Sequence, residues 1–315
     1  MSVLGKVARV PGAPLVRHAL GLDPLSQPNP ADYEAPILNR TEGGELIRAL
    51  VEAAEPVLVD RLGWVEVACC MHFLRHRCGG LLLPYRKWLR DSGRTNAGIF
   101  PNRNQGIDAF VRVFLEAATE SDVVGVWFRP GENFITNGFC PGARLVPLES
   151  IEPDYRGVPW TTALRGRRVL VIHPFADTIR CQYETKRELL FENPEVLPQF
   201  DLIVLKAVQS FAGESSTYST WSEALDRMKA EMDATSYDVC IVGAGAYGLP
   251  LAAHAKASGK VGVHMGGVTQ LLFGIKGRRW DELESVRRLY NDAWVRPAPS
   301  EMPRDWLAVE EGCYW

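Results

Sequence analysis

Short apolar runs alternate with amphipathic stretches along most of the chain. Buried strands are expected at residues 56–59, 122–128, 144–147, 168–172, 201–205 and 239–242 and at a run that begins at 261. Helices are expected at residues 44–54, 107–119, 221–233, 249–256 and 281–291, besides a long apolar one that ends near 78. Strands that alternate with helices favour parallel pairing with right-handed crossovers. The pattern predicts an α/β, Rossmann-like fold, with a mostly parallel sheet and helices on both faces.

The first forty residues differ from the rest of the chain. Four prolines (Pro24, Pro28, Pro30 and Pro36) interrupt the stretch from 22 to 40, and this composition predicts an extended arm. No internal repeat or low-complexity linker divides the remainder. We therefore expect an N-terminal arm over residues 1–40 and a single domain over residues 41–315.

The stretch from Tyr237 to Gly267 carries the most specific motif. Gly243, Gly245 and Gly248 stand in G-x-G-x-x-G spacing between an expected strand and an expected helix. Such a turn brings backbone N–H groups and the positive helix N-terminus close to an anion, usually a phosphate. The sequence favours a phosphate site here, and a turn that needs glycine only for chain reversal is the alternative.

The end of the next strand argues against a dinucleotide. A nicotinamide or flavin dinucleotide site usually has Asp or Glu about 20 residues after the glycines, where it binds the ribose hydroxyls. The strand from 261 ends instead at His264, Met265 and Gly266, without a carboxylate. We therefore expect a nucleotide whose phosphates meet the glycine turn, with His264 and Gly266 nearby.

Composition narrows the possible partners. A net charge of -3 and a pI near 6.1 give no basic footprint for nucleic acid. No apolar run approaches the ~20 residues of a transmembrane helix. The basic N-terminal residues Lys6, Arg9, Arg17 and His18 predict a loosely packed leader, with peripheral membrane contact as the alternative.

The cysteines indicate a reducing compartment. The seven form no C-x-x-C pair, their number is odd, and several lie in apolar runs. These features favour buried thiols in the cytoplasm over disulfides or a zinc site.

Polar side chains follow most of the expected strands, where parallel sheets bind their ligands. The residues in these positions are Asp60, Arg61, Glu66, Trp127, His173, Lys206, Gln209, Ser210 and His264. Each also has a structural interpretation. Glu66 could be a favourable charge at a helix N-terminus, His173 a helix cap, and Gln209 and Ser210 partners of loop backbone. Lys206 ends an apolar strand, where a buried cation would need a partner. The run 276–279 is either a solvated surface or a diphosphate lid.

Several blocks of this sequence resemble bacterial proteins with the GT-D glycosyltransferase fold. The blocks are VDRLGWVE (59–66), NAGIFP (96–101), VLVIHPF (169–175), LKAVQSFAG (205–213), VGAGAYGLPLAAHAKASGK (242–260), HMGGVTQLLFGIKGRRWD (264–281) and EEGCYW (310–315). They extend from about residue 55 to the end of the chain. The resemblance implies a Rossmann-like enzyme that moves a sugar from a nucleotide donor to a growing glycan.

The resemblance also assigns roles to residues. In the family an Asp-x-Glu motif after the first strand holds the donor through a divalent ion, Mg²⁺ or Mn²⁺. Its Glu falls on Glu66 and its Asp on Trp64, which cannot ligate a metal. The implied catalytic residues are Glu66, also the implied metal ligand, and His173. The implied nucleotide-sugar site comprises Asp60, Arg61, Gly63, Asn96, Trp127, Lys206, Gln209, Ser210, Gly243, Gly245, Gly248, His264 and Gly266.

The sequence leads to one hypothesis and two alternatives. We expect a cytoplasmic glycosyltransferase that uses a nucleotide sugar and a glycan or glycoconjugate acceptor, in surface polysaccharide assembly. One alternative is a nucleotide-sugar-binding protein without transferase activity. The other is an NAD(P)-dependent oxidoreductase, which the missing carboxylate after residue 263 disfavours.

Overall fold

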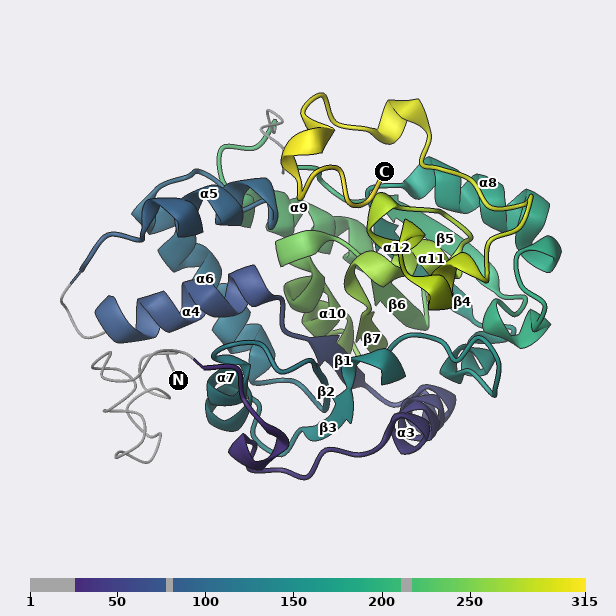
Figure 1. Cartoon of the computed structure of the whole chain (residues 1–315), viewed down its shortest axis with the longest axis horizontal. Helices are drawn as coiled ribbons and strands as arrows, with labels where there is room; N and C mark the ends of the chain where they lie inside the picture. The colour runs from purple at the N-terminus through teal and green to yellow at the C-terminus, as the bar shows by residue number, and fades with distance from the viewer. Residues whose placement is uncertain (1–25, 78–81, 211–216) are drawn as a thin grey trace.

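The computed structural model describes residues 26–77, 82–210 and 217–315. Its centre is a seven-stranded parallel sheet (Figure 1). The strands are β1 (Val57–Arg61), β2 (Val123–Val126), β3 (Arg144–Pro147), β4 (Arg168–His173), β5 (Asp201–Lys206), β6 (Val239–Val242) and β7 (Val261–His264). They pair in the order β3-β2-β1-β7-β6-β4-β5. The predicted Rossmann-like α/β arrangement is confirmed.

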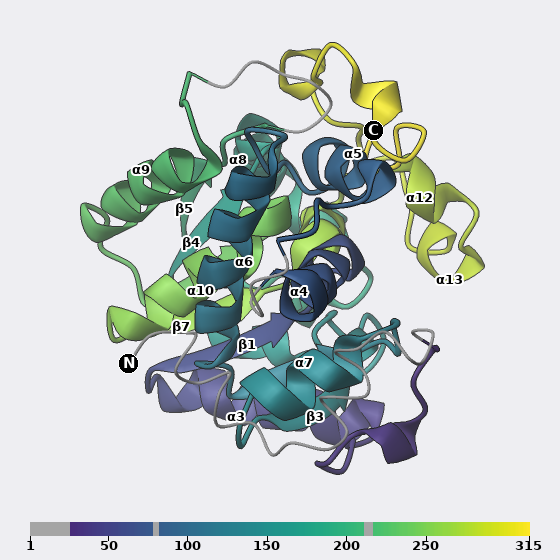
Figure 2. The ribbon, with the colours of Figure 1, turned by 90° about the vertical axis from the view of Figure 1, so that its left-hand side faces the viewer.

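Helices cover both faces of the sheet (Figures 1 and 2). The α-helices are α3 (Arg40–Ala53), α4 (Trp64–His76), α5 (Lys87–Thr95), α6 (Asn104–Ala118), α7 (Glu132–Phe139), α8 (Ala176–Lys186), α9 (Trp221–Asp233), α10 (Gly248–Ala257), α11 (Thr269–Leu272), α12 (Arg278–Asp281) and α13 (Glu284–Arg287). One apolar core lies between the sheet and α4, α6, α7, α9 and α10, and a second lies under α3, α8 and α11. Because alternate strand residues point to opposite faces, Leu58 belongs to the first core and Val59 to the second.

Most predicted elements are present, and their differences have local causes. Helix α3 begins at Arg40 rather than near residue 44, because the Asn39 side chain accepts a hydrogen bond from the Glu42 N–H at 3.0 Å. The Glu42 carboxylate returns a bond to the Asn39 N–H, which completes a capping box. The expected helix over 281–291 is wrong. The chain there forms the short helices α12 and α13, which Leu283 separates with an extended backbone.

The described part of the predicted arm lies against the domain. Ile37 pairs with Leu145 of β3, the edge strand, and the Leu38 N–H donates to the Leu145 carbonyl at 2.9 Å. The Tyr33 hydroxyl donates to the Glu132 carboxylate at 2.7 Å. These contacts fix residues 33–39 along the β3 edge of the sheet. The basic leader expected over residues 1–25 lies outside the described residues.

Two further expectations concern thiols and membrane spans. Six cysteines lie in the described residues and all are unpaired. Five of the six are buried as expected, but Cys181 is exposed on α8; Cys78 lies outside the described residues. No helix in the described ranges is long and apolar enough to cross a membrane.

Candidate functional site

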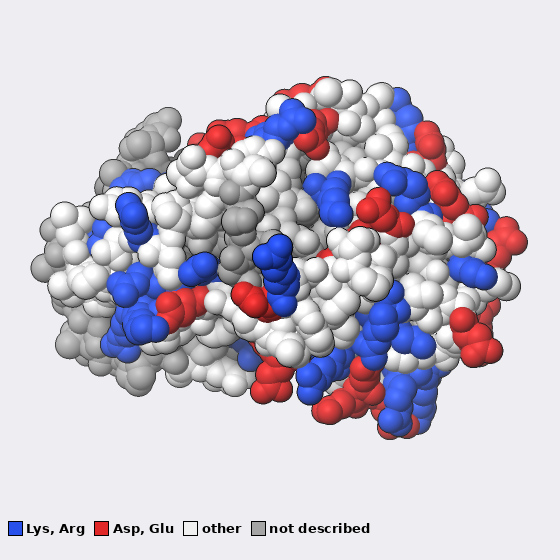
Figure 3. Space-filling view, turned by 90° about the horizontal axis from the view of Figure 1, so that it is seen from above, with Lys and Arg blue, Asp and Glu red and all other residues white. Residues whose placement is uncertain are grey.

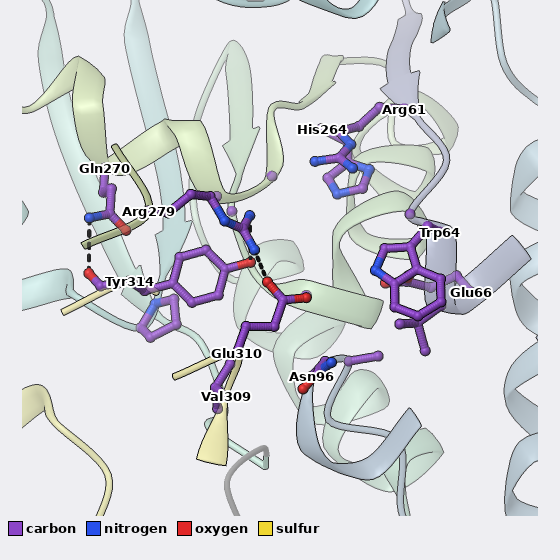
Figure 4. A pocket seen from close by; sticks show the side chains of 18 of the residues that line it. Arg61, Trp64, Glu66, Asn96, His264, Gln270, Arg279, Val309, Glu310 and Tyr314 are labelled. Carbon is purple, nitrogen blue, oxygen red and sulfur yellow. Dashed lines mark hydrogen bonds and ion pairs between the residues drawn. The ribbon is translucent and has the colours of Figure 1, made fainter. Parts of the chain in front are cut away.

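A cavity of about 370 Å³ opens at the carboxyl ends of the central strands. Its walls come from the segments that follow β1, β2, β4, β6 and β7, with α12 and the C-terminal residues on the far side (Figure 4). From β1 the chain continues to β2 and β3 on one side of β1. It then crosses to β4, β5 and β6 and finally to β7, which pairs with the other side of β1. The cavity therefore lies at the topological switch point, where open parallel sheets bind ligands.

The cavity brings together ten of the fifteen residues that the sequence indicated. These ten are Arg61, Gly63, Glu66, Asn96, Trp127, His173, Gly243, Gly245, His264 and Gly266. Asp60, Lys206, Gln209, Ser210 and Gly248 do not line it. The ten come from segments far apart in the chain, which meet because the carboxyl ends of parallel strands share one edge of the sheet.

Arg61 provides a half-buried positive charge at this edge, near the Glu66 carboxylate but without a direct ion pair to it. Its guanidinium lies over the Trp127 ring, 4.6 Å from the centroid, and has no ion-pair or hydrogen-bond partner among the described residues. The Nε atom is fully buried. Burial lowers the pKa of Arg61, and the neighbouring Glu66 carboxylate opposes that shift. A buried cation without a partner is unfavourable, so this position favours an anionic ligand.

A second guanidinium contacts the same indole. Arg129 lies 4.3 Å from the Trp127 ring centroid, and the Trp127 Nε1–H donates to the Leu62 carbonyl at 2.8 Å. The buried Glu132 carboxylate holds this loop, because it accepts bonds from the backbone N–H groups of Trp127 (3.1 Å) and Arg129 (3.3 Å). Trp127 is thereby fixed between two cations, in a cation–π arrangement.

Glu66 lies in the first turn of α4 with its carboxylate folded back over Gly63. A Cβ atom at position 63 would stand 2.1 Å from Glu66 Oε2, so only glycine leaves room for this conformation. Burial raises the pKa of the Glu66 carboxyl, while its own backbone N–H and Arg61 oppose the shift. A carboxylate whose pKa is shifted upward is suited to take a proton near neutral pH.

The His173 ring is neutral and accepts a hydrogen bond from the backbone in this structure. It is 3% exposed, and its Nδ1 accepts a bond from the Phe175 N–H at 3.0 Å. Burial lowers its pKa to about 3. Since Nδ1 is an acceptor in the neutral ring, the proton resides on Nε2. The geometry therefore supports donation from Nε2 to a ligand oxygen and does not support a role for His173 as a general base.

His264 ends β7 close to the glycine turn. Burial, together with the Arg61 charge, lowers its pKa to about 3. A Cβ atom at position 248 would stand 2.1 Å from His264 Nε2. Gly248 therefore acts through packing: it makes room for the His264 ring without lining the cavity itself.

The glycine turn presents free N–H groups. Gly243 donates to the Ile172 carbonyl (2.9 Å) and Ala246 to the Ala97 carbonyl (3.1 Å). Within the described part of the chain, the N–H groups of Ala244 and Gly245 have no acceptor. Gly245 has a left-handed backbone (φ 53°) that other residues rarely adopt. Two unpaired amides at a turn can bind an anion.

The C-terminal segment closes the far wall. Arg279 of α12 forms an ion pair with Glu310, and its guanidinium lies over the Tyr314 ring at 4.9 Å. Burial raises the pKa of the Tyr314 hydroxyl to about 12, although Arg279 opposes the shift. Sequence analysis placed Arg279 in a surface or lid run and assigned no role to Glu310, Tyr314 or Gln270. The sequence signal for these residues was that they lie in two of the family-like blocks, 264–281 and 310–315, which the fold brings together.

Three expectations for strand-end residues are corrected. Asp60 points to the face opposite Arg61, where it is fully buried and accepts a hydrogen bond from the Ser121 hydroxyl at 2.9 Å. Lys206 is exposed rather than buried, on the edge strand β5, and lies 3.8 Å from Asp177. Ser210 donates to the Gly98 carbonyl at 2.7 Å, which is the loop role proposed as its alternative.

Gln209 has a comparable structural contact. Its side-chain amide donates to the Glu301 carbonyl at 3.1 Å, and so links the end of β5 to the C-terminal region. The described residues that follow β5, 207–210, therefore pack against the chain and do not line the cavity. Its position follows from the strand order, because two strands, β4 and β6, separate β5 from β7.

The donor set around Glu66 does not fit a metal ion. No group of three or more His, Cys, Asp or Glu side chains in the described residues is arranged to hold a metal. Glu66 is adjacent to the Arg61 cation, Glu310 pairs with Arg279, and Asp60 faces the other side of the sheet. Mg²⁺ is usually held by one or two carboxylates together with phosphate oxygens and water.

Seen from above, the molecule carries both signs of charge, and acidic and basic side chains are intermixed over much of this face (Figure 3).

Comparisons of the chain with known protein families, with curated proteins and with solved structures returned no match.

Proposed function

We propose that the cavity binds the diphosphate of a nucleotide sugar and that the protein is a glycosyltransferase. The observation that carries the proposal is the half-buried guanidinium of Arg61, without an ion-pair or hydrogen-bond partner among the described residues, beside a glycine turn with two free N–H groups. Guanidinium groups bind phosphate through parallel N–H···O bonds, and backbone N–H groups in turns do the same. The Nε2–H of His173 is a further donor on the same wall.

Glu66 supports transfer over simple binding. Its carboxylate lines the same cavity, and its raised pKa suits a general base. In the proposed reaction Glu66 accepts the proton of an acceptor hydroxyl while the hydroxyl oxygen attacks the anomeric carbon. The bond from that carbon to the diphosphate breaks, and Arg61 and the turn amides stabilise the departing charge.

The alternatives predict different ligands. A dinucleotide oxidoreductase would need a carboxylate at the end of β7, where this chain has the buried residues His264 and Met265. A sensor that binds nucleotide sugars without transfer would share the phosphate contacts and would not need Glu66.

One experiment tests the proposal. Binding of UDP, GDP, CDP, their sugar conjugates, NADH and NADPH is measured by calorimetry, followed by release of the diphosphate from the bound sugar conjugate. We expect at least one nucleoside diphosphate to bind, with unchanged affinity in excess EDTA, and neither dinucleotide to bind. Glu66→Gln should retain nucleotide affinity and lose diphosphate release, because the amide cannot accept the proton.

The outcomes separate the candidates. Saturable NADH or NADPH binding without nucleotide-diphosphate binding would overturn the proposal in favour of oxidoreduction. Nucleotide-sugar binding with no release in the wild type, with or without glycan fractions, would favour the sensor. Loss of binding in EDTA that Mg²⁺ or Mn²⁺ restores would return Glu66 to the role of metal ligand.

A further inference from the structure

Two exposed tryptophans lie side by side at the mouth of the cavity. Of nine tryptophans in the chain, Trp64 (39% exposed) and Trp88 (49% exposed) are the two that are largely open to solvent. Their rings are parallel within 7°, with centroids 6.4 Å apart. Large aromatic surfaces are normally buried, so an exposed stacked pair indicates a surface that binds something.

The pair extends outward from the candidate base. Trp64 is the first residue of α4, two residues before Glu66, and it forms part of the cavity wall (Figure 4). Trp88 lies in the first turn of α5 and does not line the cavity. Together the rings therefore continue the wall that holds Glu66 onto the protein surface.

A polar group accompanies the aromatic surface. Asn96, the C-cap residue of α5, lines the cavity, and its side-chain amide has no hydrogen-bond partner among the described residues. The face of an aromatic ring is negative and attracts the polarised C–H groups of a sugar ring. An amide offers both a donor and an acceptor to sugar hydroxyls.

We propose that Trp64 and Trp88 form a platform that binds a sugar ring of the acceptor, with Asn96 bonded to its hydroxyls. This inference rests on the proposed function, because it places the acceptor where its hydroxyl reaches Glu66. A nucleobase is a poorer occupant, since the phosphate donors lie at the glycine turn and Trp88 lies outside the cavity. The free amide beside the rings also favours a sugar over an acyl chain.

The test measures sugar binding and nucleotide binding separately. The probes are methyl β-glucoside, methyl β-galactoside and N,N′-diacetylchitobiose. Their binding is measured by tryptophan fluorescence and by saturation-transfer NMR, with and without UDP or GDP. The variants are Trp88→Ala, Trp88→Phe and, as a control, Leu189→Ala, which removes an exposed apolar side chain outside the cavity lining. We expect Trp88→Ala to weaken sugar binding about 3- to 10-fold, the scale of a lost aromatic stacking contact. Trp88→Phe should restore most of the affinity, and Leu189→Ala should bind as the wild type does.

Three other outcomes would overturn the platform, and a fourth would refute only the proposed donor. If no probe binds the wild type, or if Trp88→Ala binds each probe as tightly as the wild type, the rings do not hold a sugar. If Trp88→Ala loses nucleotide affinity instead, the pair stacks on the base. If the variant loses only adsorption to phosphatidylglycerol vesicles, the pair contacts lipid. Failure of every nucleotide to bind, with sugar binding intact, would refute the proposed donor and leave the sugar platform standing.

Discussion

Replacement of Arg61 by methionine should strengthen the fold and weaken ligand binding. Methionine keeps an unbranched apolar stem against Trp127 and removes the guanidinium, which has no partner among the described residues. An incompletely paired, desolvated cation costs several kcal/mol, whereas its removal loses the cation–π contact, about 0.5–2 kcal/mol, and the attraction of the Glu66 carboxylate. We therefore expect a net gain of about 1 kcal/mol, or about 2–4 °C in Tm, for the ligand-free protein.

The same change should have the opposite effect on nucleotide affinity. Losing a charge-assisted contact to phosphate costs about 1.5–3 kcal/mol, which corresponds to about 10- to 150-fold in Kd. The assays are thermal denaturation without ligand and calorimetric titration with the nucleoside diphosphate that binds best. Arg227→Met is the matched control, because Arg227 pairs with Glu231 on the exposed face of α9. It should change neither quantity appreciably.

Two results would refute this reasoning. A folded Arg61→Met variant that binds nucleotide as tightly as the wild type would show that the guanidinium does not contact the ligand. A variant with a lower Tm would show that Arg61 is a structural cation whose charge is already balanced.

The remaining predictions concern the glycine turn and the buried carboxyl. Gly243→Ala should abolish nucleotide binding, because its Cβ would stand within 2.7 Å of His173, the Gly266 carbonyl and Thr269. The control is Gly259→Ala, where φ is 78° and no atom lies within 4 Å of the added Cβ; this change should lower only the Tm. Unchanged binding by folded Gly243→Ala would remove the turn from the site. Burial raises the pKa of Asp60 from its ordinary value of 3.8 to about 7, so its protonated form contributes stability that is fully present below 3.8 and lost as the pH rises through about 7. Asp60→Asn, which mimics that form, should therefore exceed the wild type in Tm by a margin that grows from about pH 4 to about pH 7; a margin independent of pH would contradict the shift.

Local sequence patterns predicted most of the elements and the glycine turn between β6 and α10. Strands β3 and β6 and helix α9 have the predicted bounds, because short apolar runs and amphipathic periodicity act within a few residues. The turn at Gly243 and Gly245 could likewise be predicted from the sequence, because the strand, the glycines and the helix are contiguous in the chain. The expected helix over 281–291 failed where packing decides: Trp280 and Val286 are buried, but Leu283 between them is 48% exposed.

The composition of the site depended on the tertiary structure. Lys206 and His173 both end apolar strands, and only the strand order sends β5 to the sheet edge and β4 to the cavity. Asn96 and Trp64 share a wall because α4 packs on α5, and Arg279 meets Glu310 and Tyr314 across more than thirty residues. The sequence alone determined which segments form strands, helices and the glycine turn, because those preferences are local. Which charges meet and which remain unpaired was decided by long-range packing, since the free energy of a buried charge depends on neighbours that are distant in the chain.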